Sequence, residues 1–178
     1  MRGWGLGLVA AGLITAGASR AAVVDATPGG FQVQETVDIA APAAKVWAAL
    51  GEYGSWWNSK HSWSGDAKNL SLDLKPGGCL CETLPNGGGA RHGTVIFLVP
   101  GKTVIVDGTL GPLMFSGTSG HLVWGLKEAN GHTTVTQVYY VGGYFQGGLD
   151  KLAPDVDEVL TEQLGRLKAY VETGKPTP

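Results

Sequence analysis

One long amphipathic segment near the end of the chain, residues 153–173, constrains the fold most. Its apolar residues recur at the three- and four-residue spacing of an α-helix, which places them in one stripe: Val156, Val159, Leu160, Leu164, Leu167, Tyr170 and Val171. Pro154 suits the first helical position, and Gly174 suits the C-terminal cap. A helix with one apolar stripe must cover another element, so we expect it to pack against a sheet.

Nearly everything between residues 32 and 144 has the pattern of short strands. Residues 31–39 alternate between apolar and polar, and two short helices are expected over residues 42–50 and around 53–57. From residue 70 onward, strands are separated by turns, of which Asn130-Gly131 is a strong hairpin signal. We therefore predict an α+β fold, in which a curved antiparallel sheet of about seven strands wraps around the C-terminal helix.

The first 21 residues have the pattern of a secretory signal peptide. A short positive start at Arg2 precedes an apolar run, and small residues follow that allow cleavage after Ala18 or Ala21. A membrane anchor is the alternative, but the run is shorter than the roughly 20 residues that a span needs. We expect residues 22–30 to be a linker, and the mature protein to be periplasmic or secreted with no stable membrane insertion.

Charge and motifs exclude several classes of function. The 178 residues carry a net charge of −2, which does not favour a nucleic-acid partner. The chain has no phosphate-binding loop and no nucleophile motif, so we expect no cofactor and no covalent catalysis. The pattern says nothing about the oligomeric state.

The two cysteines, Cys79 and Cys81, lie two residues apart in a predicted strand. Their side chains would share a face with Cα atoms about 6.6 Å apart, a separation at which a bridge is strained. We expect two buried thiols, with a disulfide as the alternative. Together with His61 and His92 they could in principle meet at a zinc ion, but the spacing matches no common site, so we expect no metal.

The sequence VDIAAPAAKVW at residues 37–47, the turn at residues 76–78 and the C-terminal helix resemble the SRPBCC superfamily. This is the helix-grip fold of START-related lipid-transfer domains, birch-pollen-allergen-like proteins, polyketide cyclases and dehydrases, and activators of the heat-shock ATPase. The resemblance covers a domain over residues 31–174. It implies a cavity between sheet and helix that takes a hydrophobic or amphipathic small molecule, and it supplies no shared set of catalytic residues.

Candidate site residues follow from this expected cavity. We expect aromatic and histidine side chains to line it: Trp57, His61, Trp63, His92, Trp124, Tyr140 and Tyr144. The candidate acid–base residues are His92, Glu35, Glu82 and Tyr140. Glu35 breaks the apolar face of its strand. Both faces of the strand at residues 91–99 are largely apolar, so alternation does not tell whether His92 faces the cavity.

Three functions stay open on the sequence. The first is binding or carriage of a hydrophobic small molecule, the second a cofactor-independent cyclase or dehydratase with a His/carboxylate pair, and the third a protein-interaction module resembling the heat-shock ATPase activators. An inward-facing histidine or carboxylate within about 3 Å of a second titratable group would favour the enzyme. Exposed aromatics at residues 56–63 with no cavity beneath them would favour the interaction module.

Overall fold

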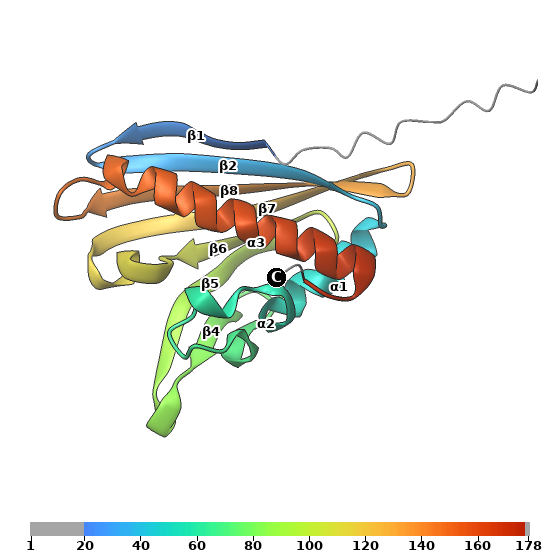
Figure 1. Ribbon diagram of the computed structural model, residues 1–178, viewed down its shortest axis with the longest axis horizontal. Coiled ribbons are helices and arrows are strands. Elements are labelled where there is room, and N and C mark those ends of the chain that lie inside the picture. The colour runs from blue at the N-terminus through green and yellow to red at the C-terminus, as the bar shows by residue number, and fades with distance from the viewer. Residues whose placement is uncertain (1–19, 177–178) are drawn as a thin grey trace, which may run out of the picture.

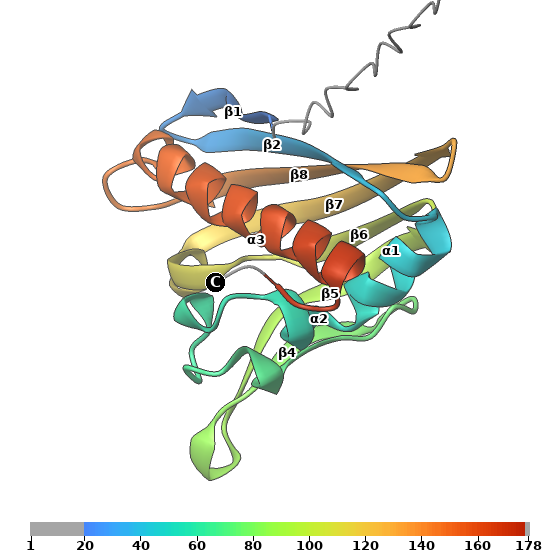
Figure 2. The ribbon, with the colours of Figure 1, turned by 45° about the vertical axis from the view of Figure 1, so that its right-hand side comes forward.

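A computed structural model describes residues 20–176, which form one curved antiparallel sheet covered on one face by helices (Figures 1 and 2). The elements in order are β1 (Arg20–Thr27), β2 (Gly30–Ile39), α1 (Ala43–Gly51), α2 (Tyr53–Trp56), β3 (Leu70–Leu72), β4 (Cys79–Thr83), β5 (Gly89–Val99), β6 (Thr103–Gly108), β7 (Gly117–Ala129), β8 (His132–Tyr144) and α3 (Ala153–Thr173). The sheet order is β1-β2-β8-β7-β6-β5-β4-β3. This confirms the predicted helix-grip fold, with eight strands.

The helix α3 begins and ends at the predicted residues and crosses the sheet diagonally (Figure 1). Its buried face includes Leu160, Leu164, Leu167 and Val171, each at most 2% exposed. Burial of each such side chain contributes about 1.5–3 kcal/mol, which holds the helix on the sheet. Gly174 caps the helix in the left-handed region at φ 78°, and its N–H donates to the carbonyl of Tyr170.

The prediction of a linker over residues 22–30 is wrong, because most of that segment is strand β1. β1 pairs with β2 from Arg20 opposite Thr36 to Thr27 opposite Gly30. It is an edge strand, and residues 22–27 are all exposed, so no buried face imposes an alternating pattern that the sequence could reveal. The predicted signal peptide falls on residues 1–21, of which residues 1–19 lie outside the described part of the chain.

The two short helices lie where they were predicted, after β2 (Figure 2). Both contact β3, the last strand of the sheet. The hairpin at Asn130-Gly131 is also confirmed, with both residues at positive φ between β7 and β8. Within residues 20–176, no helix combines the length and the apolar character needed to cross a membrane.

Candidate functional site

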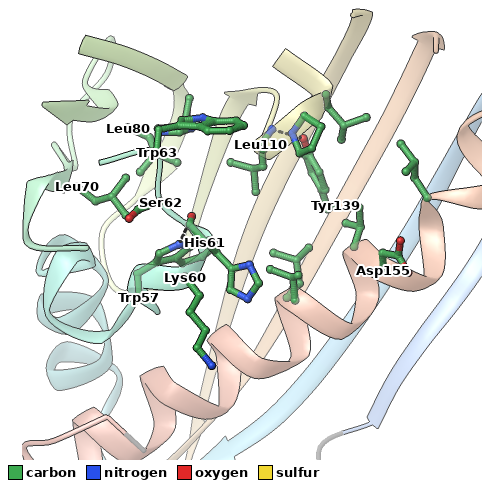
Figure 3. Close-up of a pocket in the computed structure, with 18 of the residues that line it drawn as sticks. Trp57, Lys60, His61, Ser62, Trp63, Leu70, Leu80, Leu110, Tyr139 and Asp155 are labelled. Atoms are coloured by element: carbon green, nitrogen blue, oxygen red, sulfur yellow. Dashed lines mark hydrogen bonds between the residues drawn. The ribbon is translucent and has the colours of Figure 1, made fainter. Parts of the chain in front are cut away.

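A cavity of about 380 Å³ lies between the first turns of α3, the segment after α2, and strands β4 and β5. Its floor is apolar and includes the buried side chains of Leu80, Leu113 and Leu160. Figure 3 shows Trp57, Trp63 and Leu70 on one side of the cavity and Asp155 of α3 on the other. The sheet and the start of α3 therefore enclose the space that the helix-grip fold was expected to leave.

Polar groups are few and fall at two levels of this cavity. His92 and Tyr139 are buried side chains in its wall, whereas Lys60, His61 and Asp155 are exposed residues at its mouth. The Tyr139 hydroxyl accepts from the Leu110 N–H at 3.0 Å and donates to the Gly108 carbonyl at 3.3 Å. Burial raises the pKa of Tyr139 well above its usual value, so this phenol stays protonated.

His92 faces the cavity because of an irregularity in β5. The register between β4 and β5 shifts between Leu80, opposite Gly93, and Cys81, opposite Arg91, which leaves His92 as an extra residue. Such a bulge breaks strict alternation: His92 and Val95 are both buried although they are three positions apart, a spacing that would put them on opposite faces of a regular strand. This bulge is the reason that alternation in the sequence could not orient His92.

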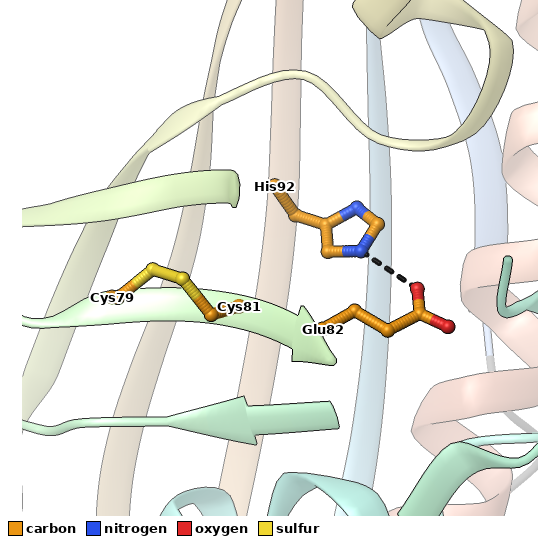
Figure 4. The surroundings of a disulfide bond; sticks show 4 residues. All are labelled: Cys79, Cys81, Glu82 and His92. Carbon is orange, nitrogen blue, oxygen red and sulfur yellow. Dashed lines mark hydrogen bonds and ion pairs between the residues drawn. A yellow bond between two sulfur atoms is a disulfide. The ribbon is translucent and has the colours of Figure 1, made fainter. Parts of the chain in front are cut away.

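His92 pairs with Glu82, a buried carboxylate on β4. The distance from His92 Nε2 to Glu82 Oε2 is 3.0 Å, and the two side chains are 7% and 0% exposed (Figure 4). An ionised carboxylate only accepts hydrogen bonds, so Nε2 carries a proton, and Nδ1 is the nitrogen that can act as a base when the ring is neutral. The pair meets the geometric criterion that separates an acid–base site from a purely apolar binding pocket.

Glu82 also anchors the loop that forms one side of the mouth. Its two carboxylate oxygens accept from the backbone N–H groups of Trp63 at 3.1 Å and Ser64 at 2.5 Å. Burial alone would raise the pKa of Glu82, but the hydrogen bonds from Ser64, Trp63 and His92 outweigh it and lower that pKa. Glu82 is therefore a carboxylate that holds both the histidine and the loop.

The same loop is tied to α3 on its other side. Trp57 Nε1 donates to the His61 carbonyl at 2.9 Å, and His61 Nε2 lies 3.1 Å from Glu162 Oε2. Asn58 N donates to Gln163 Oε1 at 2.8 Å, and the Asn58 side chain donates to Glu162. These contacts bring the predicted lining residues Trp57 and His61 to the cavity.

An aromatic pair forms the rim. Trp63 and Phe115 meet edge to face with ring centroids 5.3 Å apart, and they are 44% and 76% exposed. Phe115 belongs to the short helical segment Gly111–Phe115, whose residues 111–113 also line the cavity. The sequence did not identify that segment as part of a site, because Gly111-Pro112 signals a turn and carries no information about what the turn covers.

Three further candidates lie away from this cavity. Trp124 is fully buried and does not line the cavity. It packs edge to face on Tyr53, which does. Tyr140 and Tyr144, at 46% and 73% exposed, lie outside it too, and Tyr140 borders a separate depression beside β1. In the adjacent pair it is Tyr139 that points inward. The structure thus brings Trp57, His61, Trp63 and His92 together, but not Trp124, Tyr140 or Tyr144.

Glu35 lies in a separate buried network between β2, β8 and α3. Trp124 Nε1 donates to Gln137 Oε1 at 2.6 Å, and Gln137 Nε2 donates to Glu35 Oε2 at 3.2 Å and to the Leu160 carbonyl at 3.3 Å. Burial, together with the neighbouring Asp157, raises the pKa of Glu35 to about 8 against the opposing hydrogen bond from Gln137. Glu35 is therefore a protonated acid beneath α3 rather than a group in the cavity wall.

The expectation of two free thiols is wrong, because Cys79 and Cys81 are joined by a disulfide (Figure 4). Their Cα atoms lie 5.3 Å apart, closer than the 6.6 Å spacing of a regular strand, at the place where the β4–β5 register shifts. Bridged sulfurs are not thiolate ligands. Within residues 20–176, no group of three His, Cys, Asp or Glu side chains is placed to hold a metal ion.

Comparison with known proteins places this geometry in a family. The model of the family described as polyketide cyclase / dehydrase and lipid transport matches residues 30–172. No protein of curated function matches the sequence.

Solved structures share the fold at low identity. CalU16 from Micromonospora echinospora is 15% identical, with 90% of this chain and 88% of that chain covered and a TM-score of 0.59. DynU16, from the dynemicin biosynthetic locus, is 21% identical over 82% of this chain and 48% of its own, with a TM-score of 0.58. The Aha1 dimer from Colwellia psychrerythraea is 22% identical over 81% of this chain and 98% of its own, with a TM-score of 0.53. At these identities the likeness shows the fold alone.

Proposed function

Because the chain belongs to the polyketide cyclase / dehydrase and lipid transport family, we propose that it binds a hydrophobic or amphipathic small molecule in the cavity beneath Trp63. The observation that carries the proposal is the open-mouthed cavity of about 380 Å³ with an apolar floor, a size and character suited to a small ligand. Lys60, His61 and Asp155 at the mouth suit a polar end of the ligand, and the Lys60 ammonium can meet an anionic group.

A cavity-filling variant tests this proposal. The amphipathic fluorophore 1-anilinonaphthalene-8-sulfonate serves as the probe, because its rings suit the floor and its sulfonate suits the mouth. Val159 lines the cavity from α3, so we expect Val159→Trp to weaken probe binding by about tenfold or more. Val24→Trp is the matched control, because Val24 is 53% exposed on β1 and outside the lining. Equal affinity of the two variants would reject binding in this cavity.

Acid–base catalysis is the second candidate, and the His92–Glu82 pair specifically favours it. A neutral imidazole held by a buried carboxylate can remove a proton next to a carbonyl, as aldol-type cyclisation or dehydration requires. We expect the protein to accelerate deuterium exchange at the α-carbon of acetophenone in deuterated water, followed by NMR. Loss of the acceleration in His92→Gln would support the enzyme. If the wild type leaves the exchange at its uncatalysed rate, the enzyme candidate is rejected and ligand binding remains as the proposed function.

The interaction-module reading has less support. An interaction module was expected to show exposed aromatic side chains at residues 56–63 with no cavity beneath them. Instead, Trp56 and Trp57 are buried, and the cavity lies beneath Trp63. The likeness to the Aha1 dimer concerns the fold.

We also propose that residues 1–21 direct export and are removed. Cleavage after Ala18 would leave the whole of β1, whereas cleavage after Ala21 would remove its first two pairings with β2. Both leave the cavity untouched, because the residues that line it begin at Tyr53. The mass of the protein recovered from an exporting host tests this proposal and distinguishes the two positions. Recovery of the full-length mass would reject it.

A further inference from the structure

The disulfide between Cys79 and Cys81 lies on the face of β4 that points away from the cavity. Leu80 between the two cysteines and Glu82 after them are 1% and 2% exposed, and both contribute to the cavity or its acid–base pair. Successive side chains in a strand point to opposite faces, and both cysteines are half-buried rather than enclosed. The two sulfurs therefore lie on the face opposite the cavity and belong to residues that are only half-buried.

We expect this disulfide to contribute little to the stability of the fold. It encloses a single residue, and in the chain-entropy account the stabilisation by a disulfide grows with the length of the loop that it closes. β4 is held without it, because Cys81 pairs with Ser71 of β3 and with Arg91 of β5, and Cys79 pairs with Thr94 of β5. The bond could therefore open while the strand stays in the sheet.

Arg91 of β5 is a cationic residue paired with Cys81 in the sheet. It is an exposed residue directly opposite Cys81 in the β4–β5 ladder, and directly opposed residues of an antiparallel pair share a face. A guanidinium beside a cysteine favours its thiolate, and a thiol with a lowered pKa is the better leaving group when a disulfide is attacked. Labile, regulatory and catalytic disulfides are found among exposed bridges rather than among fully enclosed structural ones.

We propose that Cys79-Leu80-Cys81 is a thiol–disulfide exchange site that oxidises dithiols in peptides or proteins. A substrate thiolate attacks Sγ of Cys79, so that a mixed disulfide forms, the Cys79–Cys81 bond breaks, and Cys81 leaves as a thiolate opposite Arg91. The second substrate thiolate then attacks the substrate sulfur of the mixed disulfide and releases Cys79. The substrate loses two electrons and two protons, and the cysteine pair gains both. The site acts independently of the proposed ligand cavity.

The test is a stoichiometric oxidation by the full, bridged protein. The probe is a synthetic peptide with two cysteines, and mass spectrometry follows both partners. We expect one peptide disulfide to form for each protein molecule, while the protein gains two hydrogens and keeps its folded circular dichroism. A bridge that reacts with the peptide only in denaturant would overturn the proposal.

Two sets of variants separate exchange from a structural role. Arg91→Gln should slow the oxidation by about threefold to tenfold, whereas Lys102→Gln, which also removes an exposed charge but at the β5–β6 turn, should not change it. Equal rates in the two variants would remove Arg91 from the mechanism as proposed. The double variant Cys79→Ser/Cys81→Ser should lose the oxidation and unfold within a few degrees of the wild type. A much lower unfolding temperature would show that the bridge is structural and would overturn the proposal.

Discussion

His92 Nε2 and Glu82 Oε2 lie 3.0 Å apart in the wall of the cavity, and the same carboxylate accepts the backbone N–H groups of Trp63 and Ser64. One buried side chain thus orients the buried histidine of the wall and fixes the loop at the mouth. We expect Glu82→Gln to lower the free energy of unfolding by about 1–3 kcal/mol, because the NH₂ group of the glutamine cannot accept a hydrogen bond and leaves at least one of these donors without a partner. Glu82→Ala should cost about 3–5 kcal/mol.

Urea unfolding measures both effects, and cleavage by a protease should appear within residues 59–66 of the Glu82 variants. Glu158→Gln is the control, because Glu158 is an exposed carboxylate on α3. Equal stability of Glu82→Gln and Glu158→Gln would mean that the loop does not depend on the buried carboxylate.

Trp124 should behave as a core residue rather than as a ligand contact. It is 0% exposed and donates to Gln137, so Trp124→Phe would leave the Gln137 Oε1 atom without its donor. We expect a cost of about 1–3 kcal/mol from that unsatisfied group, and about 3–5 kcal/mol for Trp124→Ala, which also leaves a cavity. Affinity of Trp124→Phe for the anilinonaphthalene probe should equal that of the wild type. A loss of affinity without a loss of stability would place Trp124 in the ligand site.

The close approach of the β5 and β6 backbones at His92 requires glycine at residue 108. A Cβ atom there would lie 2.0 Å from the His92 carbonyl oxygen and 2.4 Å from the Gly93 Cα atom, and both are backbone atoms. We expect Gly108→Ala to destabilise the protein by about 3 kcal/mol, because the strands must move apart. Gly125→Ala in β7 is the control, since its nearest neighbour would lie at 3.9 Å. Similar denaturation midpoints for the two variants would contradict this account.

The regular elements could be predicted because their own residue patterns indicate their secondary structure. The stripe of residues 153–173 gave the helix to its last residue, and Asn130-Gly131 gave the hairpin, since each pattern records local burial or local backbone conformation. β1 could not be predicted from alternation, because its described side chains face solvent on both sides. Its pairing with β2 depends on backbone groups, which every sequence carries.

The site was harder to predict than the fold, because two bulges in β5 decide which residues face inward. The register shifts at His92 and again between Val95 and Phe97, so the alternation that was traced along residues 91–99 changes face within the strand. A bulge depends on the register of both neighbouring strands, and a single strand's sequence does not record it. The Glu82–His92 pair and the disulfide beside it both lie at the first of these bulges.

The buried acid Glu35 predicts how stability depends on pH. Its pKa is about 8 in the folded protein and near 4.5 when exposed in the unfolded chain, and burial also raises the pKa of Asp157. Between these values the folded state binds a proton that the unfolded state has released. Stability therefore falls as pH rises from about 5 to about 8, with a slope that approaches 1.4 kcal/mol per pH unit.

Other carboxylates affect the stability only at lower pH. Despite burial, hydrogen bonds lower the pKa values of Glu82, Glu162 and Glu172, so their stabilisation is complete above about 4.5 and is lost only as pH falls below it. The decline between about pH 5 and 8 is thus assigned mainly to Glu35. Glu35→Gln keeps an oxygen to accept from Gln137 and offers an amide donor to Asp157, so it should flatten that decline and be more stable than the wild type near pH 8. Urea unfolding at several pH values measures both curves, and parallel curves would mean that another group carries the pH dependence.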